Sequence, residues 1–378
     1  MQFADVLEQL ESTFYQQAIA KFKDADFTAA GFPSSQIPIE QFQSIQADEA
    51  THSVVLQAAL KSFGETPITG CQFNFDSALT DVATMAATAR VVETVGVAAY
   101  LGGATLITDP VLLTAAGSIL TVEARHQTIL NVLSSTGTAI PAAFDFAFTP
   151  SEVLALAAPF ITGGCEIPIP ANTPLAITNT GSVGPGTLLT FSASTINGTI
   201  PQESLFCQML LGGEATSIPL PLSQCIVPDI NGPVAIFITS DGQALVNNVR
   251  DRAQNKIVAG PTLAFIDTKP QMLGQLSRLI GTPGANGAQV STSTRTISPA
   301  EASAIIENSG AAAPAATDAP VDGSESTPIV APADGASDST PIVAPPSNGA
   351  AAGSSPGPNA FVGKSADGKI TVNGWKTS

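Results

Sequence analysis

The sequence is poor in basic residues and in long apolar runs, and each shortage excludes a class of protein. Lys and Arg number 14 against 31 Asp and Glu, which leaves a net charge of −17 and a pI of about 4.3. Such a charge argues against nucleic acids and anionic membrane surfaces as partners. No run of about 18 apolar residues is present, so we expect no helix that spans a bilayer.

Cysteine is also scarce, and its spacing excludes some metal and redox sites. The 4 cysteines include no Cys-x-x-Cys pair, which excludes a zinc ribbon or a thioredoxin motif. Their even number allows two disulfides, Cys71 with Cys165 and Cys207 with Cys225, and the alternative is four buried thiols. A sequon at Asn197 and a Ser-, Thr- and Pro-rich tail favour an oxidising compartment. We therefore expect a secreted or cell-wall-associated glycoprotein whose leader peptide is absent from this sequence.

The chain has only 2 histidines, and both occur in the pattern Glu-x-x-His. Glu49 and His52 lie in "ADEATHSVVL", and Glu123 and His126 lie in "LTVEARHQTI". Acids make up only 31 of 378 residues, so the repeated spacing is an uncommon coincidence. Residues three apart share one face of a helix, and a carboxylate beside an imidazole is half of a dinuclear metal site. The alternative for each histidine is a hydrogen-bonded structural role.

A dinuclear site of this kind needs two further helices that each supply one glutamate. The candidates are Glu93 on one helix and either Glu8 or Glu11 on another. Tyr15 follows Glu8 by seven residues, and Tyr100 follows Glu93 by the same seven, which is two helical turns. This repeat favours Glu8 as the ligand and predicts that Glu11 either lies just behind the ligands or faces solvent. The tyrosines are candidates for a catalytic role beside the ligands, the alternative being core aromatics with a bonded hydroxyl.

The predicted metal ligands are therefore two Glu-x-x-His pairs and two single glutamates. They are Glu8, Glu49, His52, Glu93, Glu123 and His126.

Composition divides the chain into a helical part over 1–165, a β-rich accessory part over 166–280 and an Ala-, Pro-, Ser-, Thr- and Gly-rich tail over 281–378. Helical periodicity and capping residues predict helices over 3–22, 38–63, 77–100, 110–133 and 151–161.

In a four-helix bundle of this type the second and third helices run parallel. The link 64–76 must then cross the bundle, and we expect an extended strap held at Cys71.

Short apolar and β-branched segments separated by turn residues predict a small all-β, sandwich-like domain. The predicted strands are 186–194, 204–212, 215–222, 232–240, 243–247 and 256–266. This part has no histidine and no clustered acids, so we expect an accessory structural role. The tail cannot bury enough apolar area to offset the entropy of ordering it, which predicts disorder.

Five stretches carry a family resemblance: "LEQLESTFY", "DEATHSVVL", "VVETVGVAAYLGGA", "SILTVEARHQTIL" and "AFDFAFTPSEVLALAAPFI". Together they resemble the ferritin-like domain of fungal stress-response and plant desiccation-related proteins, over residues 1 to about 165. The ligand pattern alone is similar to bacterioferritin and rubrerythrin. The resemblance implies a four-helix bundle with two iron or two manganese ions, in a protein linked to stress. The β-rich part and the tail depart from storage ferritins, so a homo-oligomer is allowed but a closed cage is not expected.

Two functions are compatible with these observations. The first is a di-iron or di-manganese oxidoreductase with oxidase, ferroxidase or peroxide-consuming activity, whose partners are O2, peroxide or metal ions. The second is a non-catalytic secreted structural protein of desiccation stress, in which the metal is absent or only structural. Neither alternative identifies an organic substrate.

Overall fold

The computed structural model describes residues 1–278, 360–364 and 371–374, in two compact units, Met1–Val290 and Ser291–Ser378. In the second unit, β9 (Ala360–Lys364) and β10 (Thr371–Gly374) pair as an antiparallel ladder. The disorder predicted for the rest of 281–378 lies outside the described residues.

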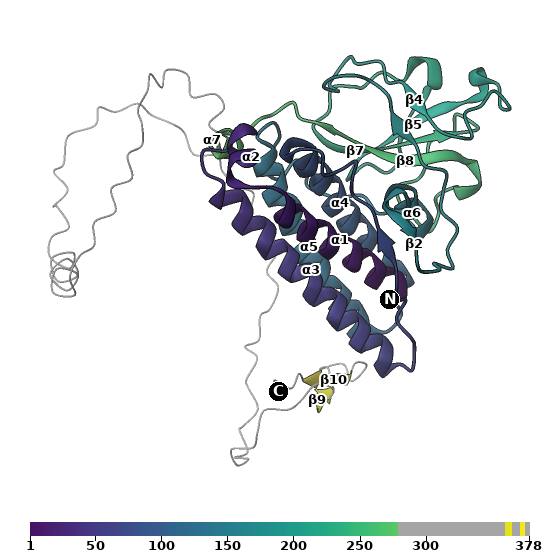
Figure 1. The fold of residues 1–378 in the computed structure, drawn as a ribbon. Helices are drawn as coiled ribbons and strands as arrows, with labels where there is room; N and C mark the ends of the chain where they lie inside the picture. Colours follow the sequence, from purple (N-terminus) through teal and green to yellow (C-terminus); the bar gives the residue numbers. More distant parts are fainter. Residues whose placement is uncertain (279–359, 365–370, 375–378) are drawn as a thin grey trace, which may run out of the picture. The chain divides into compact units, whose positions relative to one another are not determined.

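Four long helices dominate the first unit and confirm the predicted helical part (Figure 1). They are α1 (Gln2–Lys21), α3 (Gln36–Ser62), α4 (Val82–Gly103) and α5 (Pro110–Ser134). Three shorter helices accompany them: α2 (Asp24–Ala29), α6 (Pro150–Ala157) and α7 (Met272–Ser277). The sequence did not predict α2, which fills part of the connection between α1 and α3.

The starts of α4 and α5 are set by side chains that accept hydrogen bonds from free backbone N–H groups. Asp109 accepts from the N–H groups of Val111 and Leu112, and Pro110 occupies the first turn, as predicted for α5. The third long helix was predicted to begin at residue 77 but begins at Val82. The reason is Asp81, which accepts from the N–H of Thr84 and caps the helix there.

The link between α3 and α4 is the predicted strap, and it lies along α1. Gln2, at the start of α1, donates from its side-chain amide to the carbonyl of Thr66, and further along α1 the Phe14 ring packs on Phe75 with centroids 5.3 Å apart. The strap therefore runs from the end of α3 back along the bundle to the start of α4. Within it, β1 (Gln72–Phe73) pairs with β2 (Ile161–Gly163).

Two disulfides are present, between the residues that the sequence paired. Cys71 in the strap is bonded to Cys165, 94 residues away, and Cys207 to Cys225, 18 residues away. No free cysteine remains. A disulfide that closes a long loop restricts the unfolded chain most, so the Cys71–Cys165 bond is expected to stabilise the strap against the bundle.

We expect the double variant Cys71→Ser and Cys165→Ser to lower the free energy of unfolding by about 2–4 kcal/mol, because the unfolded chain regains the entropy of the opened loop. Urea unfolding measures the loss, and Cys207→Ser with Cys225→Ser is the comparison for a shorter loop. An unchanged midpoint, or four titratable thiols in the untreated protein, would contradict this expectation.

The β-rich part contains a four-stranded antiparallel sheet in the order β6-β5-β7-β8. Its strands are β5 (Phe206–Leu210), β6 (Ile218–Pro221), β7 (Gly232–Thr239) and β8 (Ile257–Ile266). A second small ladder pairs β3 (Ala176–Ile177) with β4 (Phe191–Ser192). The predicted strand at 243–247 forms only an isolated bridge from Val246 to Thr216, because no strand partner continues beside it.

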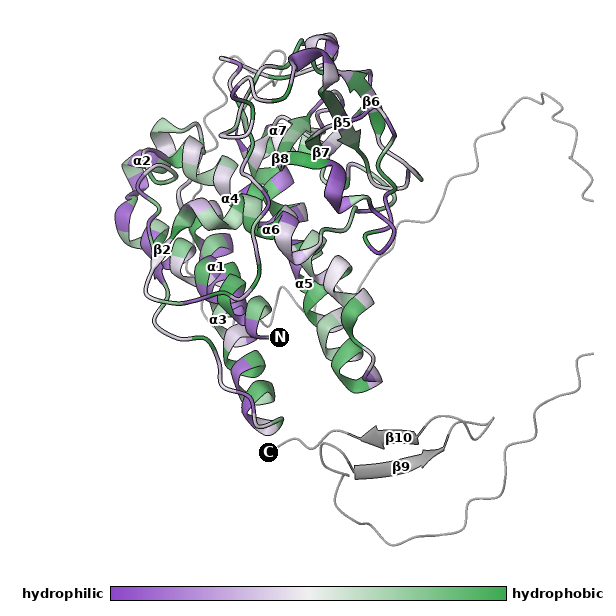
Figure 2. Ribbon diagram, turned by 90° about the vertical axis from the view of Figure 1, so that its right-hand side faces the viewer, coloured by the Kyte–Doolittle hydropathy of each residue, from purple (hydrophilic) through white to green (hydrophobic). Residues whose placement is uncertain are grey.

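Alternate residues of β7 belong to two different apolar cores, as the two-residue period of a strand requires. Ala235 and Phe237 join the core that contains the bundle residues, whereas Val234, Ile236 and Ile238 join the core on the other face of the sheet. The β3–β4 region contributes to that second core, which makes the β-rich part sandwich-like. Figure 2 shows the sheet strands largely in the hydrophobic colour.

Buried ion pairs join the sheet region to the bundle. Arg252 lies 2.6 Å from Glu152 of α6, and both side chains are fully buried. Arg90 of α4 binds Asp267 at 2.8 Å, just beyond β8. The helical and β-rich parts share a core and one compact unit, and their division at residue 165 into separate domains stays a prediction.

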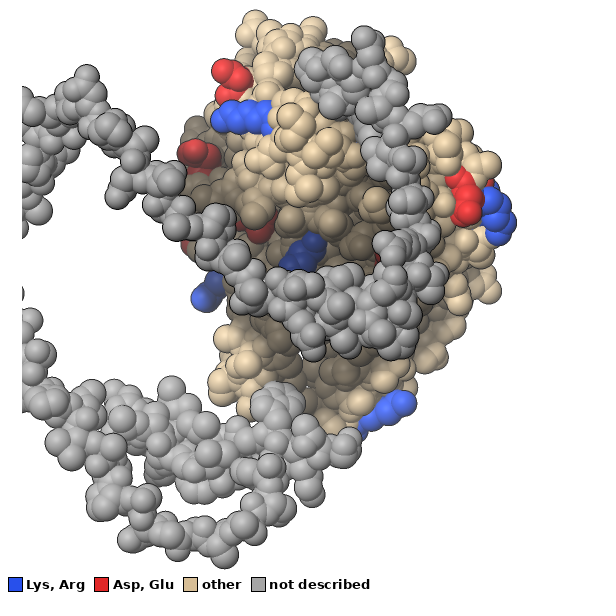
Figure 3. All heavy atoms as spheres, turned by 90° about the vertical axis from the view of Figure 1, so that its left-hand side faces the viewer, with Lys and Arg blue, Asp and Glu red and all other residues tan. Residues whose placement is uncertain are grey.

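One helical stretch of the described residues, Val82–Leu106, is long and apolar enough to cross a membrane, but 67% of its apolar window is buried in the structure. That burial is typical of a core helix. On the face drawn in Figure 3, the charged side chains of the visible described residues are scattered rather than gathered into a basic patch.

Candidate metal centre

Each of the four long helices contributes to one buried polar cluster. Glu8 comes from α1, Glu93 from α4, and α3 and α5 each supply a Glu-x-x-His pair. All four glutamates are 0% exposed, and His126 is 5% exposed. The structure thus brings together the six side chains that the sequence selected. Their role as ligands stays a prediction.

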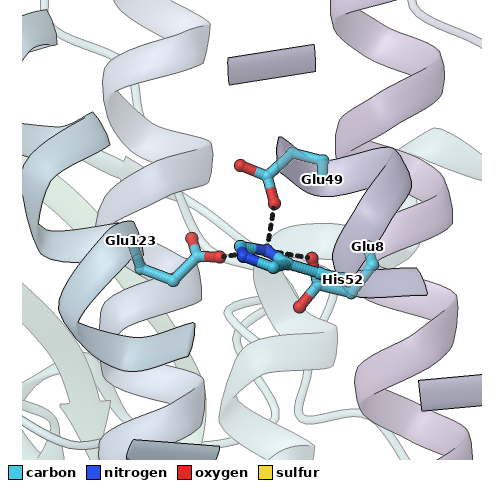
Figure 4. Close-up of side chains that lie close together, drawn as sticks. All are labelled: Glu8, Glu49, His52 and Glu123. Carbon is cyan, nitrogen blue, oxygen red and sulfur yellow. Dashed lines mark hydrogen bonds and ion pairs between the residues drawn. The ribbon is translucent and has the colours of Figure 1, made fainter. Parts of the chain in front are cut away.

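The first half of the cluster surrounds His52 (Figure 4). Its Nδ1 lies 3.1 Å from Glu8 Oε2, 3.0 Å from Glu49 Oε2 and 3.4 Å from Glu123 Oε1. Each of these four residues offers a ligand atom within 4.8 Å of the others. The distances are short enough for one ion to contact all four.

The second half surrounds His126 in the same way. Its Nδ1 lies 2.7 Å from Glu49 Oε1 and 3.2 Å from Glu93 Oε2. Glu49, Glu93, Glu123 and His126 form the second group with ligand atoms within 4.8 Å of one another. Glu49 and Glu123 belong to both groups, so these two carboxylates are the ones placed to bridge two ions.

The two tyrosines orient the two glutamates that belong to a single group. Tyr15 donates to Glu93 Oε1 at 2.6 Å, and Tyr100 donates to Glu8 Oε1. The sequence placed each tyrosine on the same helix face as its own glutamate, and the structure connects each to the glutamate of the other helix. The two copies of the Glu and Tyr pattern, on α1 and on α4, therefore contact each other through hydrogen bonds between the two helices.

Asp48 is a residue of the site that the sequence analysis missed. Its Oδ2 lies 3.1 Å from Nε2 of His126, on the ring edge opposite the carboxylates. An imidazole held this way presents its other nitrogen in a fixed direction, which strengthens a metal ligand. The matching position before Glu123 is Val122, so His52 has no equivalent acidic partner and the two halves of the cluster differ here. The only signal in the sequence was an additional acid directly before Glu49.

Glu11 occupies the first of the two placements that the sequence allowed it, behind the ligands rather than in solvent. Its side chain is only 4% exposed, and it lies beside the cluster next to Glu123. The sequence left both placements open, because the position of Gly96 of α4 opposite Glu11 has no local signal in the sequence. A glycine there leaves room for a carboxylate.

Burial and mutual contacts shift the pKa values of the cluster in opposite directions. Burial raises the pKa of Glu8 to about 8. Burial would raise the pKa of Glu49 as well, but the neighbouring His126 and His52 rings lower it to about 2. Burial opposes a charged His52 ring, yet its bonds to Glu123, Glu49 and Glu8 raise its pKa to about 12. Protonated histidines thus provide the positive charge of the metal-free cluster.

The buried oxygens that lack hydrogen bonds test whether a metal fits here. Both carboxylate oxygens of Glu123 and Oε1 of Glu49 are buried without a hydrogen-bond partner among the described residues. Glu49 Oε1 is within ion-pair distance of His126 Nδ1, but the ring N–H is not aligned with it. Unpartnered buried carboxylates cost several kcal/mol, which a bound cation offsets. Mixed carboxylate and imidazole donors suit iron or manganese.

We expect Asp48→Asn to weaken binding of one of two metal ions by about 10–100-fold, because His126 loses its charged partner. Glu40→Gln, an exposed acid on the same helix, is the matched control. Isothermal titration with Mn²⁺ separates the two binding steps. Equal weakening of both steps, or no change, would contradict the assignment of Asp48 to the His126 half alone.

Comparison with known proteins agrees with this geometry. No curated protein matches the chain. A family model described as ferritin-like domain matches residues 1–136, which include all four long helices and every member of the cluster. The match supports a ferritin-like family assignment for residues 1–136.

Proposed function

We propose that the protein is a di-metal carboxylate protein that uses iron or manganese to consume O2 or peroxide in stress protection. The observation that carries the proposal is the pair of overlapping buried groups that share Glu49 and Glu123. A structural remnant of such a site would not need to retain both bridging carboxylates, both histidines and both single glutamates.

The residues that would hold the ions follow from the two groups. Glu8 and His52 belong to one ion, Glu93 and His126 to the other, and Glu49 and Glu123 to both. Bound iron or manganese would supply electron transfer to a small oxidant. Tyr100 and Tyr15 hold the carboxylates of Glu8 and Glu93 in place, and Asp48 holds the His126 ring.

Access to the cluster supports a small substrate. The His52 side chain is 11% exposed, and the glutamates around it are 0% exposed. Two hollows open on the described surface, one along Ser12 and Ser53 and one beside Phe144, and no member of the cluster lines either of them. O2, peroxide and metal ions are small enough to reach the ligands.

Metal analysis followed by turnover tests the proposal. The purified full chain is expected to contain or take up two Fe or Mn ions, and the loaded protein is expected to consume O2 on addition of Fe(II) or to decompose hydrogen peroxide. Binding without either reaction would favour the alternative of a non-catalytic stress protein with a structural metal. A chain that takes up no ion would contradict the proposal.

The two disulfides are consistent with an extracellular protein, and we extend the proposal to secretion or attachment to a cell wall. Asn197 is exposed, and its side chain accepts a hydrogen bond from the N–H of Thr199 within the sequon. Such an asparagine is open to glycosylation. A mass decrease on endoglycosidase treatment of the native secreted protein is the expected result.

A further inference from the structure

A polar hollow opens on the described surface between α1, α3 and the strap. Its volume is about 510 Å³, which is within the range of sites that bind small molecules. None of the described side chains that line it is charged, although the chain has a net charge of −17. Most of the lining consists of amide and hydroxyl side chains and one aromatic ring: Gln9, Ser12, Thr13, Gln17, Gln72 and Phe73.

A buried carboxylate beside the hollow fixes two of the side chains that line it. Asp5 is 0% exposed and accepts hydrogen bonds from the Ser53 hydroxyl at 2.7 Å and from the Gln9 amide at 3.0 Å. The same amide nitrogen of Gln9 donates to the carbonyl of Ile68 in the strap at 3.3 Å. Both N–H groups of Gln9 are therefore used, which leaves its carbonyl oxygen to accept a bond from a ligand.

Two hydroxyl groups of α1 are also available to a ligand. Ser12 Oγ accepts a bond from the Gln46 amide at 3.2 Å, and its hydroxyl hydrogen has no acceptor among the described residues. Thr13 makes no side-chain hydrogen bond within the described part of the chain, whereas Thr51 and Thr114 each donate to the carbonyl four residues before them. The hollow therefore offers one carbonyl oxygen and two hydroxyl groups from neighbouring turns of α1.

An aromatic ring completes the lining. Phe73 is half-buried in the β1–β2 ladder, and its ring stacks on Phe75 with centroids 6.2 Å apart. Amides and hydroxyls beside an aromatic ring suit a neutral sugar, because sugar hydroxyls both donate and accept and the C–H face of a sugar packs on a ring. Phosphates, carboxylates and amines would find no charged partner in this lining.

We infer that this hollow binds a short segment of a neutral saccharide. The inference does not depend on the di-metal function, since no member of the metal cluster lines the hollow. The ligand has two sources with the same chemistry, a free disaccharide and the chain of a polysaccharide.

Binding to soluble and insoluble sugars tests the site and distinguishes these sources. Titration calorimetry of the full chain uses cellobiose, maltose and diacetylchitobiose, and sedimentation uses cellulose, starch and chitin. We expect at least one of these probes to bind, and we expect digalacturonic acid, which carries carboxylates, not to bind. Binding of a disaccharide without retention on its polymer identifies a free sugar as the ligand, and retention on the polymer identifies the polysaccharide.

A matched pair of glutamines connects any binding to the hollow. Gln17 and Gln16 are both exposed on α1, but only Gln17 lines the hollow. Thr13→Val with Gln17→Ala is expected to weaken binding of the sugar by about tenfold or more, because each change removes a hydrogen-bonding group. Gln16→Ala should bind as the unchanged protein does, and thermal melts verify that each variant is folded.

Two results would overturn the inference. One is that none of the neutral probes binds to the folded full chain. The other is that the double variant of Thr13 and Gln17 binds a probe as tightly as Gln16→Ala does, because the sugar would then lie elsewhere. Either result leaves the di-metal function standing, since that function is measured by metal content and turnover.

Discussion

Glu49→Ala is expected to remove both ions of the metal pair, and Glu123→Ala should match it. Each carboxylate belongs to both ligand groups, so its loss takes a ligand from each ion and leaves no bridge between them. The remaining buried glutamates then repel one another without a cation. Binding isotherms with Mn²⁺ or anaerobic Fe(II) on folded variants measure the effect, which should exceed about 100-fold in affinity.

The single glutamates provide the internal comparison. Glu8→Ala and Glu93→Ala should form a second matched pair with a smaller effect, because each removes one ligand of one ion and water can replace it. Glu11→Ala should leave the pair bound. A result in which Glu11→Ala empties the site while Glu8→Ala leaves it filled would show that the assignment on α1 is wrong.

The metal-free protein is expected to lose stability as the pH rises from about 5 to 9. The pKa of Glu8 is about 8 in the folded protein against an ordinary value of 4.5, so its proton favours folding below pH 4.5 and this contribution is lost as the pH passes 8. The pKa values of His52 and His126 are raised from 6.5 to about 12 and about 11. Their protons therefore also favour folding at low pH, and this contribution falls as the pH rises. Glu49 is ionised in both states above pH 5 and does not oppose the trend.

Melting temperatures of the metal-free chain should therefore fall steadily over this range. Glu8→Gln removes one titrating group and should flatten the dependence. Saturating Mn²⁺ should reverse the trend, because the ligands must lose their protons to bind and the gain from metal grows with pH. A metal-free melting temperature that does not change between pH 5 and 9 would contradict the charges assigned to the cluster.

Local patterns made the long helices and the six cluster members predictable from sequence. Glu-x-x-His needs only the period of one helix, and Asp109 with Pro110 needs only the geometry of one helix start. The same reasoning found the strap, because helix length and linker length together leave few paths for it.

Contacts between helices were beyond this reasoning. Asp48 reaches His126 across 78 residues, and Tyr100 reaches Glu8 across 92, so neither pairing has a local signature. The burial of Glu11 depends on Gly96 in another helix. Contacts that depend on how the helices pack against one another could therefore not be assigned from the sequence, although it contains all of the residues involved.

Anomalous diffraction from crystals of the full chain grown with Mn²⁺ tests the central claim most directly. The di-metal assignment predicts two strong peaks inside the bundle, one among Glu8, Glu49, His52 and Glu123 and the other among Glu49, Glu93, Glu123 and His126. Peaks confined to surface carboxylates, with none between the four long helices of a fully loaded crystal, would contradict it.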